Sequence, residues 1–298
     1  MIIRRDTFWF STLTMRKGSI VKRVAWRCLL ITLLACVIVL VEKHYPSTFT
    51  KVSATPFTLL GLSLSIFLSF RNNACYARWW EGRQMWGKII IEVRSFIRES
   101  IALPEPARRA ALYQLLGFAH ALGARLRGAS EYQAAKPWVA ELSDDGGDNI
   151  SDLLLRQLGE RCATLAKEGQ MSEWRYITLE QRLQGLSEAQ ANCERIKNTP
   201  LPFPYTLLLH RTTFLFCLLL PIAMAEPLGW LAPLFTTMVS YTFFGLDAIA
   251  TELEDPFGME DNDLPIDALI RTVEREILAA TGTKALPPPL KPVNFVLS

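Results

Sequence analysis

Apolar residues gather in four runs along the chain, separated by polar stretches of different length. The runs are Val24–Val41, Val52–Phe70, Thr212–Ala225 and Pro227–Leu246. A helix that crosses the hydrocarbon layer needs about 20 mainly apolar residues, and the first run carries Arg27 as its only charge. Residues 75–198 instead alternate charged and apolar positions at helical spacing, which indicates amphipathic helices in water. The pattern predicts an all-α membrane protein with four transmembrane helices and a separate cytoplasmic helical bundle.

These runs divide the chain into five segments. We expect a cytoplasmic or interfacial N-terminal segment (1–23), two transmembrane helices (24–74), a cytoplasmic helical region (75–200), two further transmembrane segments (201–250) and a cytoplasmic C-terminal segment (251–298). Within the first segment, Thr7–Gly18 is aromatic and amphipathic, which favours an interfacial helix over a disordered start. Pro202 and Pro204 predict a non-helical entry into the third membrane segment, because proline lacks an N–H and disfavours helix at the preceding residue.

Basic residues flank the runs unequally and predict the orientation. Six of them precede the first run, against Asp6 as the only acid, and four more follow the second run before residue 90. The loop between these runs carries only Lys43, His44 and Lys51. The positive-inside rule therefore places both termini and the polar middle region in the cytoplasm. We expect no cleavable signal peptide, because the first run begins far from Met1 and lacks a small-residue cleavage site.

The second run combines an apolar stripe with serines. Leu62, Ile66 and Phe70 follow one another at a spacing of four, which places them on one narrow face of a helix. The adjacent polar positions in the same run are Ser63, Ser65 and Ser69. A ring of such faces, one from each subunit, would form an apolar constriction in a pore. The alternative is that the stripe packs against neighbouring helices or lipid.

Composition and motif spacing argue against several other functions. The net charge of +3 is small and its basic residues lie where the topology needs them, so nucleic-acid binding is not indicated. The six cysteines form no CxxC pair, and we interpret them as reduced thiols. The three histidines are scattered, and the chain has no phosphate-binding glycine loop or nucleophile elbow, so we expect no enzymatic activity. Arg211, which lies within the predicted membrane segments 201–250, needs a partner, for which Glu81 and Asp247 are candidates.

Three local motifs together resemble the bestrophin family of ion channels, and specifically its bacterial branch. The first is Arg78-Trp79-Trp80, which begins eight residues after Phe70 and resembles the triplet that follows the family's pore-lining helix. The second is the proline-rich entry Pro202-Phe203-Pro204-Tyr205-Thr206. The third is Asp255-Pro256-Phe257-Gly258, followed by acidic residues. Each motif alone is weak, but their order and spacing together identify the chain as resembling this family.

The resemblance implies a homopentamer in a bacterial inner membrane, arranged around one pore with a neck in the membrane and a cytoplasmic vestibule. By position it assigns Leu62, Ile66 and Phe70 to the neck and Ile177 to the narrow cytoplasmic aperture, the latter by counting back from Cys193. The alternative for Ile177 is a buried or interfacial helix position.

The acidic residues after the third motif are a weak candidate for a divalent cation site. Glu260, Asp261 and Asp263 offer oxygen ligands of the kind that calcium prefers. Eukaryotic bestrophins hold calcium in the corresponding run, but here Met259 and Asn262 interrupt it. We therefore expect no required cofactor, and favour a solvated turn or a structural divalent site over a calcium switch.

The predicted function is passive conduction of monovalent ions. Phenylalanine edges carry partial positive charge that favours anions, and this neck has one phenylalanine beside two aliphatic residues. The serine hydroxyls and the resemblance to bacterial members lean towards sodium, with a chloride channel as the alternative. A membrane scaffold or sensor that conducts nothing is the alternative of another class, whereas a transporter is less favoured because the chain shows no internal repeat.

Overall fold

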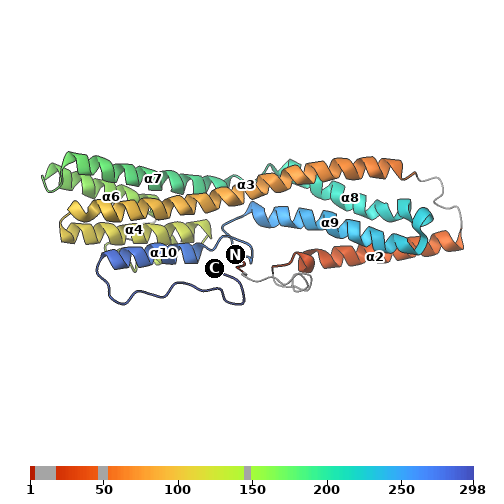
Figure 1. Ribbon diagram of the computed structural model, residues 1–298. Helices are drawn as coiled ribbons and strands as arrows, with labels where there is room; N and C mark the ends of the chain where they lie inside the picture. Colours follow the sequence, from red (N-terminus) through yellow and green to blue (C-terminus); the bar gives the residue numbers. More distant parts are fainter. Residues whose placement is uncertain (4–17, 46–52, 144–148) are drawn as a thin grey trace. The chain divides into compact units, whose positions relative to one another are not determined.

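The computed structural model describes residues 1–3, 18–45, 53–143 and 149–298. The expected interfacial helix over Thr7–Gly18 lies, except for Gly18, outside these residues. Within them the fold is all-helical, as predicted, and the only β pairings are isolated bridges near the two chain ends. The α-helices shown in Figure 1 are α2 (Val21–His44), α3 (Thr55–Glu99), α4 (Glu105–Leu126), α5 (Glu131–Ala135), α6 (Ile150–Lys167), α7 (Glu173–Asn198), α8 (Phe203–Leu228), α9 (Ala232–Glu254) and α10 (Ile266–Ala280).

The chain forms two compact units. Unit 1 comprises Met1–Arg4, Trp80–Thr199 and Pro256–Ser298, and unit 2 comprises Arg5–Trp79 and Pro200–Asp255. Helix α3 is a single helix that contributes residues up to Trp79 to unit 2 and later residues to unit 1. The expected division into five membrane and cytoplasmic segments stays a prediction.

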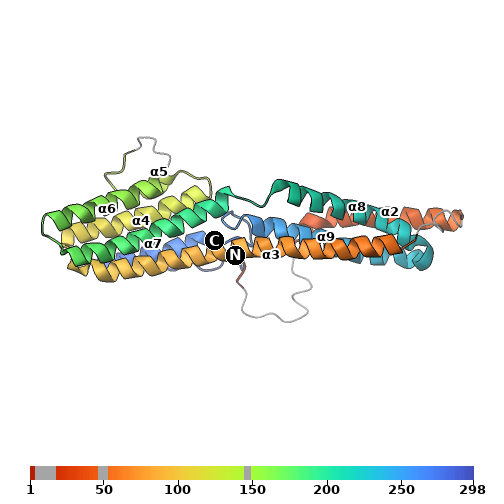
Figure 2. The same ribbon diagram turned by 90° about the horizontal axis from the view of Figure 1, so that it is seen from above.

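Unit 2 is a bundle of α2, α8, α9 and the N-terminal part of α3, which run side by side in both ribbon views (Figures 1 and 2). Its core joins leucines of α3 to aromatic residues of α8 and α9, with Leu64, Leu68, Phe216 and Phe244 all buried. By length and composition, two stretches of the described residues are apolar enough to cross a membrane, Val21–His44 and the 52 residues Phe203–Glu254 that contain α8 and α9. Four separate spans therefore remain a prediction.

Helix α8 corrects the expected entry into the third membrane segment. The segment was expected to be non-helical at its alternate prolines, but α8 begins at Phe203 and places Pro204 in its first turn. Proline is tolerated there because the first N–H groups of a helix have no partner within the helix. Pro221 and Pro227 also lie inside α8. The expected non-helical entry is therefore confirmed at Leu201 and Pro202 and wrong from Phe203 onward.

Unit 1 packs α4, α6, α7 and α10 with the C-terminal part of α3 around a leucine-rich core. Helix α4 is central, because Leu112, Leu115 and Leu122 are fully buried. At Gly123 a Cβ atom would lie 2.4 Å from Cδ1 of Ile270, so a larger residue would require the Ile270 side chain to move. A similar close approach occurs where α7 meets α3, since a Cβ on Gly185 would lie 2.5 Å from the Glu92 carboxylate, which would have to move.

All six cysteines are free thiols. In unit 1, burial raises the pKa of the Cys162 thiol to about 11 and that of Cys193 to about 12. Because the thiolate is the reactive form, these two cysteines are chemically inert packing residues at neutral pH.

Candidate pore helix and its ionic network

The N-terminal part of α3 has two distinct faces. Leu64, Leu68, Arg71 and Cys75 are buried, and their spacing of three or four residues places them on one side of the helix. On the same side, a Cβ atom on Gly61 would lie 3.1 Å from the Phe216 ring of α8. This face fixes the rotation of α3 in the bundle.

The other face carries the predicted neck residues. Leu62 is 62% exposed, Ile66 is 48% exposed and Phe70 is 60% exposed, although all three are large and apolar. Exposed large apolar residues in a row indicate a surface that meets something other than bulk water. The structure therefore brings these three residues together on one unpartnered stripe, while their role in a pore stays a prediction.

The serines lie beside this stripe and bond to their own helix. The hydroxyl of Ser63 donates to the carbonyl oxygen of Leu59 at 3.0 Å, and that of Ser65 donates to Gly61 at 2.8 Å. Ser69 is also exposed. Because the hydroxyl hydrogens of Ser63 and Ser65 are used in the helix, their lone pairs are the groups left for other contacts.

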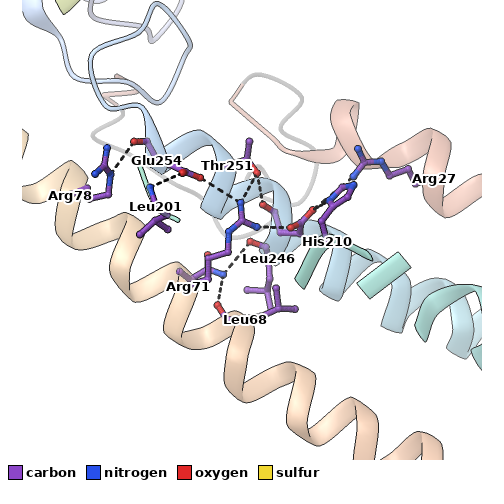
Figure 3. A network of polar contacts seen from close by, with 11 residues as sticks. Arg27, Leu68, Arg71, Arg78, Leu201, His210, Leu246, Thr251 and Glu254 are labelled. Atoms are coloured by element: carbon purple, nitrogen blue, oxygen red, sulfur yellow. Dashed lines mark hydrogen bonds and ion pairs between the residues drawn. The ribbon is translucent and has the colours of Figure 1, made fainter. Parts of the chain in front are cut away.

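Next to Phe70, Arg71 turns inward and is the centre of a buried polar network (Figure 3). Its guanidinium donates to Oδ1 of Asp247 at 2.6 Å and to Oγ1 of Thr251 at 3.2 Å. It also lies 3.6 Å from Oε2 of Glu254. Arg71 is 1% exposed and Asp247 is 3% exposed, so the pair is shielded from water and unequivocally part of the core.

The network reaches every helix of unit 2. Oδ2 of Asp247 lies 2.9 Å from Nδ1 of His210 on α8 and 4.0 Å from the Arg27 guanidinium on α2. Glu254 accepts from the backbone N–H of Leu201 at 3.2 Å, just before α8 begins, and its carbonyl accepts from Nε of Arg78 at 3.3 Å. Arg78, the first residue of the Arg-Trp-Trp motif, therefore ties α3 to the end of α9.

Neither of the two candidate partners of Arg211 pairs with it. Glu81 and Asp247 were candidates for Arg211, but Glu81 pairs with Arg195 and Asp247 pairs with Arg71 and His210. Arg211 is exposed and has no ion-pair partner among the described residues. Arg71 was missed, although its helical spacing from Leu64 and Leu68 places it on the buried face and would have identified it.

Ile177, the predicted aperture residue, lies in the first turns of α7 in unit 1. Its side chain is 48% exposed, and Trp174, three residues earlier, is 82% exposed. The neighbouring Tyr176 instead lines a cavity between α6 and α7. This exposed position is free of intramolecular packing on one side, and the aperture role stays a prediction.

The acidic turn after Phe257 is organised by its own backbone. The Asp263 carboxylate accepts from the N–H of Glu260 at 2.7 Å, and the N–H of Leu264 donates to the carbonyl of Pro256 at 2.9 Å. Phe257 is fully buried against Gly82. No three acidic, histidine or cysteine side chains converge as a metal site in the described parts of the chain. The divalent site at Glu260, Asp261 and Asp263 stays a prediction.

Removing Arg71 is expected to destabilise unit 2. Arg71→Met leaves the Asp247 carboxylate buried without its main partner, which costs about 3–5 kcal/mol for a buried pair. Thermal unfolding of the purified protein should therefore show a clear loss of stability. Arg211→Met, which removes an exposed arginine from the same unit, is the matched control and should change little. A melting temperature that is equal in both variants would contradict the structural role given to Arg71.

Known proteins resemble this chain over nearly its full length. A relative from Mesorhizobium japonicum, named a voltage-dependent anion channel-forming protein, is 40% identical over 298 residues and aligns with 99% of this chain and 96% of its own. A relative of the same name from Escherichia coli K12 is 36% identical, with 98% of both chains aligned. These relatives are named channel-forming proteins and not enzymes, which confirms the expectation that the chain has no enzymatic activity.

Solved structures and a family model agree with these relatives. The crystal structure of a bacterial bestrophin homologue from Klebsiella pneumoniae matches with a TM-score of 0.83 and 32% identity, covering 88% of this chain and 100% of that one. Another match is a crystal structure described as a membrane protein, with a TM-score of 0.83 and 32% identity, which covers the same shares. The model of the bacterial and fungal bestrophin proteins matches residues 1–279. The chain is therefore a membrane protein of the bestrophin family.

Proposed function

We propose that this protein is a passive channel for small monovalent ions and that it favours anions such as chloride. The observation that carries the proposal is the exposed stripe of Leu62, Ile66 and Phe70 on a helix whose opposite face is locked into its bundle. The names of the channel-forming relatives, aligned over nearly the whole chain, support the same conclusion.

The proposed neck works by excluding water. Five chains around one axis would bring five copies of the stripe together, and a narrow apolar sleeve cannot replace the hydration shell of an ion. Conduction would then depend steeply on the radius at Leu62, Ile66 and Phe70. In the same proposal, the chains lie in a bacterial inner membrane with both termini in the cytoplasm, and Ile177 narrows the cytoplasmic exit.

The sign of the ion is inferred from the relatives and from Phe70. The sequence-based lean towards sodium finds no support among the named relatives, whose names refer to anion channels. A phenylalanine edge is electropositive and attracts anions, and the Phe70 side chain is 60% exposed. Chloride is therefore the first candidate.

Sodium remains a second candidate because of one observation. The hydroxyl hydrogens of Ser63 and Ser65 are engaged by carbonyl groups of α3. The exposed hydroxyl oxygens therefore present lone pairs, which favour a cation.

The reversal potential tests the function and its sign together. Purified protein in a planar bilayer under a sodium chloride gradient should reverse near the chloride equilibrium potential. Ile66→Phe should move the reversal potential further in that direction, because each subunit gains a second aromatic edge. Reversal near the sodium potential would select the second candidate, and a protein that inserts without passing current would contradict the channel itself.

The neck prediction concerns the exposed stripe. Replacing Leu62, Ile66 and Phe70 together by alanine should raise conductance or open probability, because every subunit widens the same constriction. Replacing the exposed Leu59 and Phe67 of the same helix by alanine is the matched control. Equal currents from the parent and the triple variant, both with the parent's oligomeric size, would contradict the neck.

In the same recordings Ile177→Ala should change conductance but not assembly, whereas loss of assembly would identify an interface residue.

The proposed channel opens without calcium. Because the Asp263 carboxylate is engaged by the Glu260 N–H, Asp261→Asn with Asp263→Asn should leave the calcium response flat while lowering stability. Currents measured with a chelator and with micromolar calcium should be alike in the parent. A steep calcium response that these substitutions abolish would instead establish a calcium switch.

A further inference from the structure

Unit 1 contains a cavity of about 400 Å³ that the conduction proposal does not use. It lies between a half-buried face of α10, Arg83 of α3 and segments from both ends of the chain. The two ends lie beside each other in both ribbon views (Figures 1 and 2). Its volume falls within the range of about 300–1,000 Å³ that is typical of small-molecule sites.

The chain ends are held in place by backbone hydrogen bonds. The N–H of Ile3 donates to the carbonyl of Phe295 at 2.9 Å, and the N–H of Leu297 donates to the carbonyl of Met1 at 2.9 Å. Arg271 donates to the carbonyl of Pro288 at 3.3 Å, and Arg275 donates to the carbonyl of Pro287. These hydrogen bonds hold the segment that contains Pro287, Pro288 and Pro289 against α10. Part of this segment, Pro289 and Leu290, forms one wall of the cavity.

Three guanidinium groups line the cavity, and their charge is incompletely balanced. Arg271 pairs with Glu274 at 2.9 Å. Arg275 is bound to a backbone carbonyl, which leaves its charge uncompensated, and Arg83 has no ion-pair or hydrogen-bond partner among the described residues.

The one carboxylate in the lining is already neutralised. Glu276 accepts two hydrogen bonds from Nε and one from Nη2 of Arg94, at 2.5–3.0 Å. Each guanidinium offers five N–H donors in a planar fork that fits phosphate or carboxylate oxygens. The excess of donors and positive charge therefore selects an anionic group.

The rest of the wall is mainly apolar, with Thr272 and Met1, whose ammonium donates to the Leu297 carbonyl at 2.6 Å, as the exceptions. Ile3, Leu269, Leu290 and Leu297 line the cavity together with Pro265 and Pro289. A simple inorganic anion would leave this surface in contact with water, whereas an anion with an apolar body would cover it.

We propose that this cavity binds a small organic anion, with its phosphate or carboxylate head on Arg83 and Arg275 and its apolar body against the leucine and proline wall. The cavity belongs to unit 1, whereas the stripe of Leu62, Ile66 and Phe70 belongs to unit 2. The binding proposal can therefore be tested independently of the proposed channel function. Because both chain ends contribute to the wall, binding would also stabilise their attachment to α10.

Calorimetry on the purified full-length protein tests the site with two probes, adenosine monophosphate and 1-naphthyl phosphate. Adenosine lacks the charged head, and inorganic phosphate lacks the apolar body. At least one of the two probes should bind once per chain with a dissociation constant on the order of 0.1–1 mM. Adenosine and inorganic phosphate should each bind about tenfold more weakly or not at all.

Two variants locate the site. Arg83→Gln should weaken probe binding about tenfold, since it removes a charge-assisted contact, and should keep the melting temperature because Arg83 has no partner to lose. Arg109→Gln makes the same charge change on α4 outside the cavity and should bind the probe like the parent. The proposal is overturned if neither probe binds up to about 10 mM, if adenosine binds as well as its monophosphate, or if both variants bind equally.

Discussion

The buried pair between Arg71 and Asp247 is the interaction on which unit 2 depends. A charge is expensive to place among apolar side chains and is retained only with a close partner and satisfied hydrogen bonds. Arg71 meets this condition through Asp247, Thr251 and Glu254 on α9. Asp247 extends the network to His210 on α8. The apolar residues of the four helices of unit 2 do not by themselves define which side of each helix faces inward. The network fixes the rotation of each helix about its own axis.

This fixed rotation explains why an apolar stripe can remain exposed. On a helix, Phe70 and Arg71 point about 100° apart, so holding Arg71 inward holds Phe70 outward. Where it meets water, the apolar face would otherwise lower its free energy by turning into the bundle. A polar interaction inside the bundle thus preserves an apolar surface outside it, which is the opposite of the arrangement in a water-soluble helix.

The sequence allowed much of the fold to be predicted, but less of the site. Apolar runs and helical spacing identified the all-helical class, and the stripe of Leu62, Ile66 and Phe70 was found from its spacing alone. The ionic network was missed because pairing depends on which face of each helix turns inward, and Asp247 is 176 residues from Arg71. The predicted start of α8 was wrong because the rules used for proline describe the interior of a helix. Pro204 instead lies in the first turn of α8, where proline is tolerated. The arginine cavity was also beyond sequence reasoning, since residues 1–3, 83 and 265–297 meet only in the folded unit.

The close approach at Gly61 connects the exposed surface of α8 with the apolar stripe on α3. Gly61 lets α3 approach the Phe216 ring closely, since a Cβ atom at this position would lie 3.1 Å from the ring. Helix α8 also carries Phe214 and Leu215, which are about half exposed and lie on the surface of an apolar helix. The Phe216 ring is one of several contacts that join α8 to α3, together with the packing of Leu64 and Leu68 in the same core. We therefore expect whatever covers Phe214 and Leu215 to influence how α3 packs at Gly61, the residue directly before Leu62.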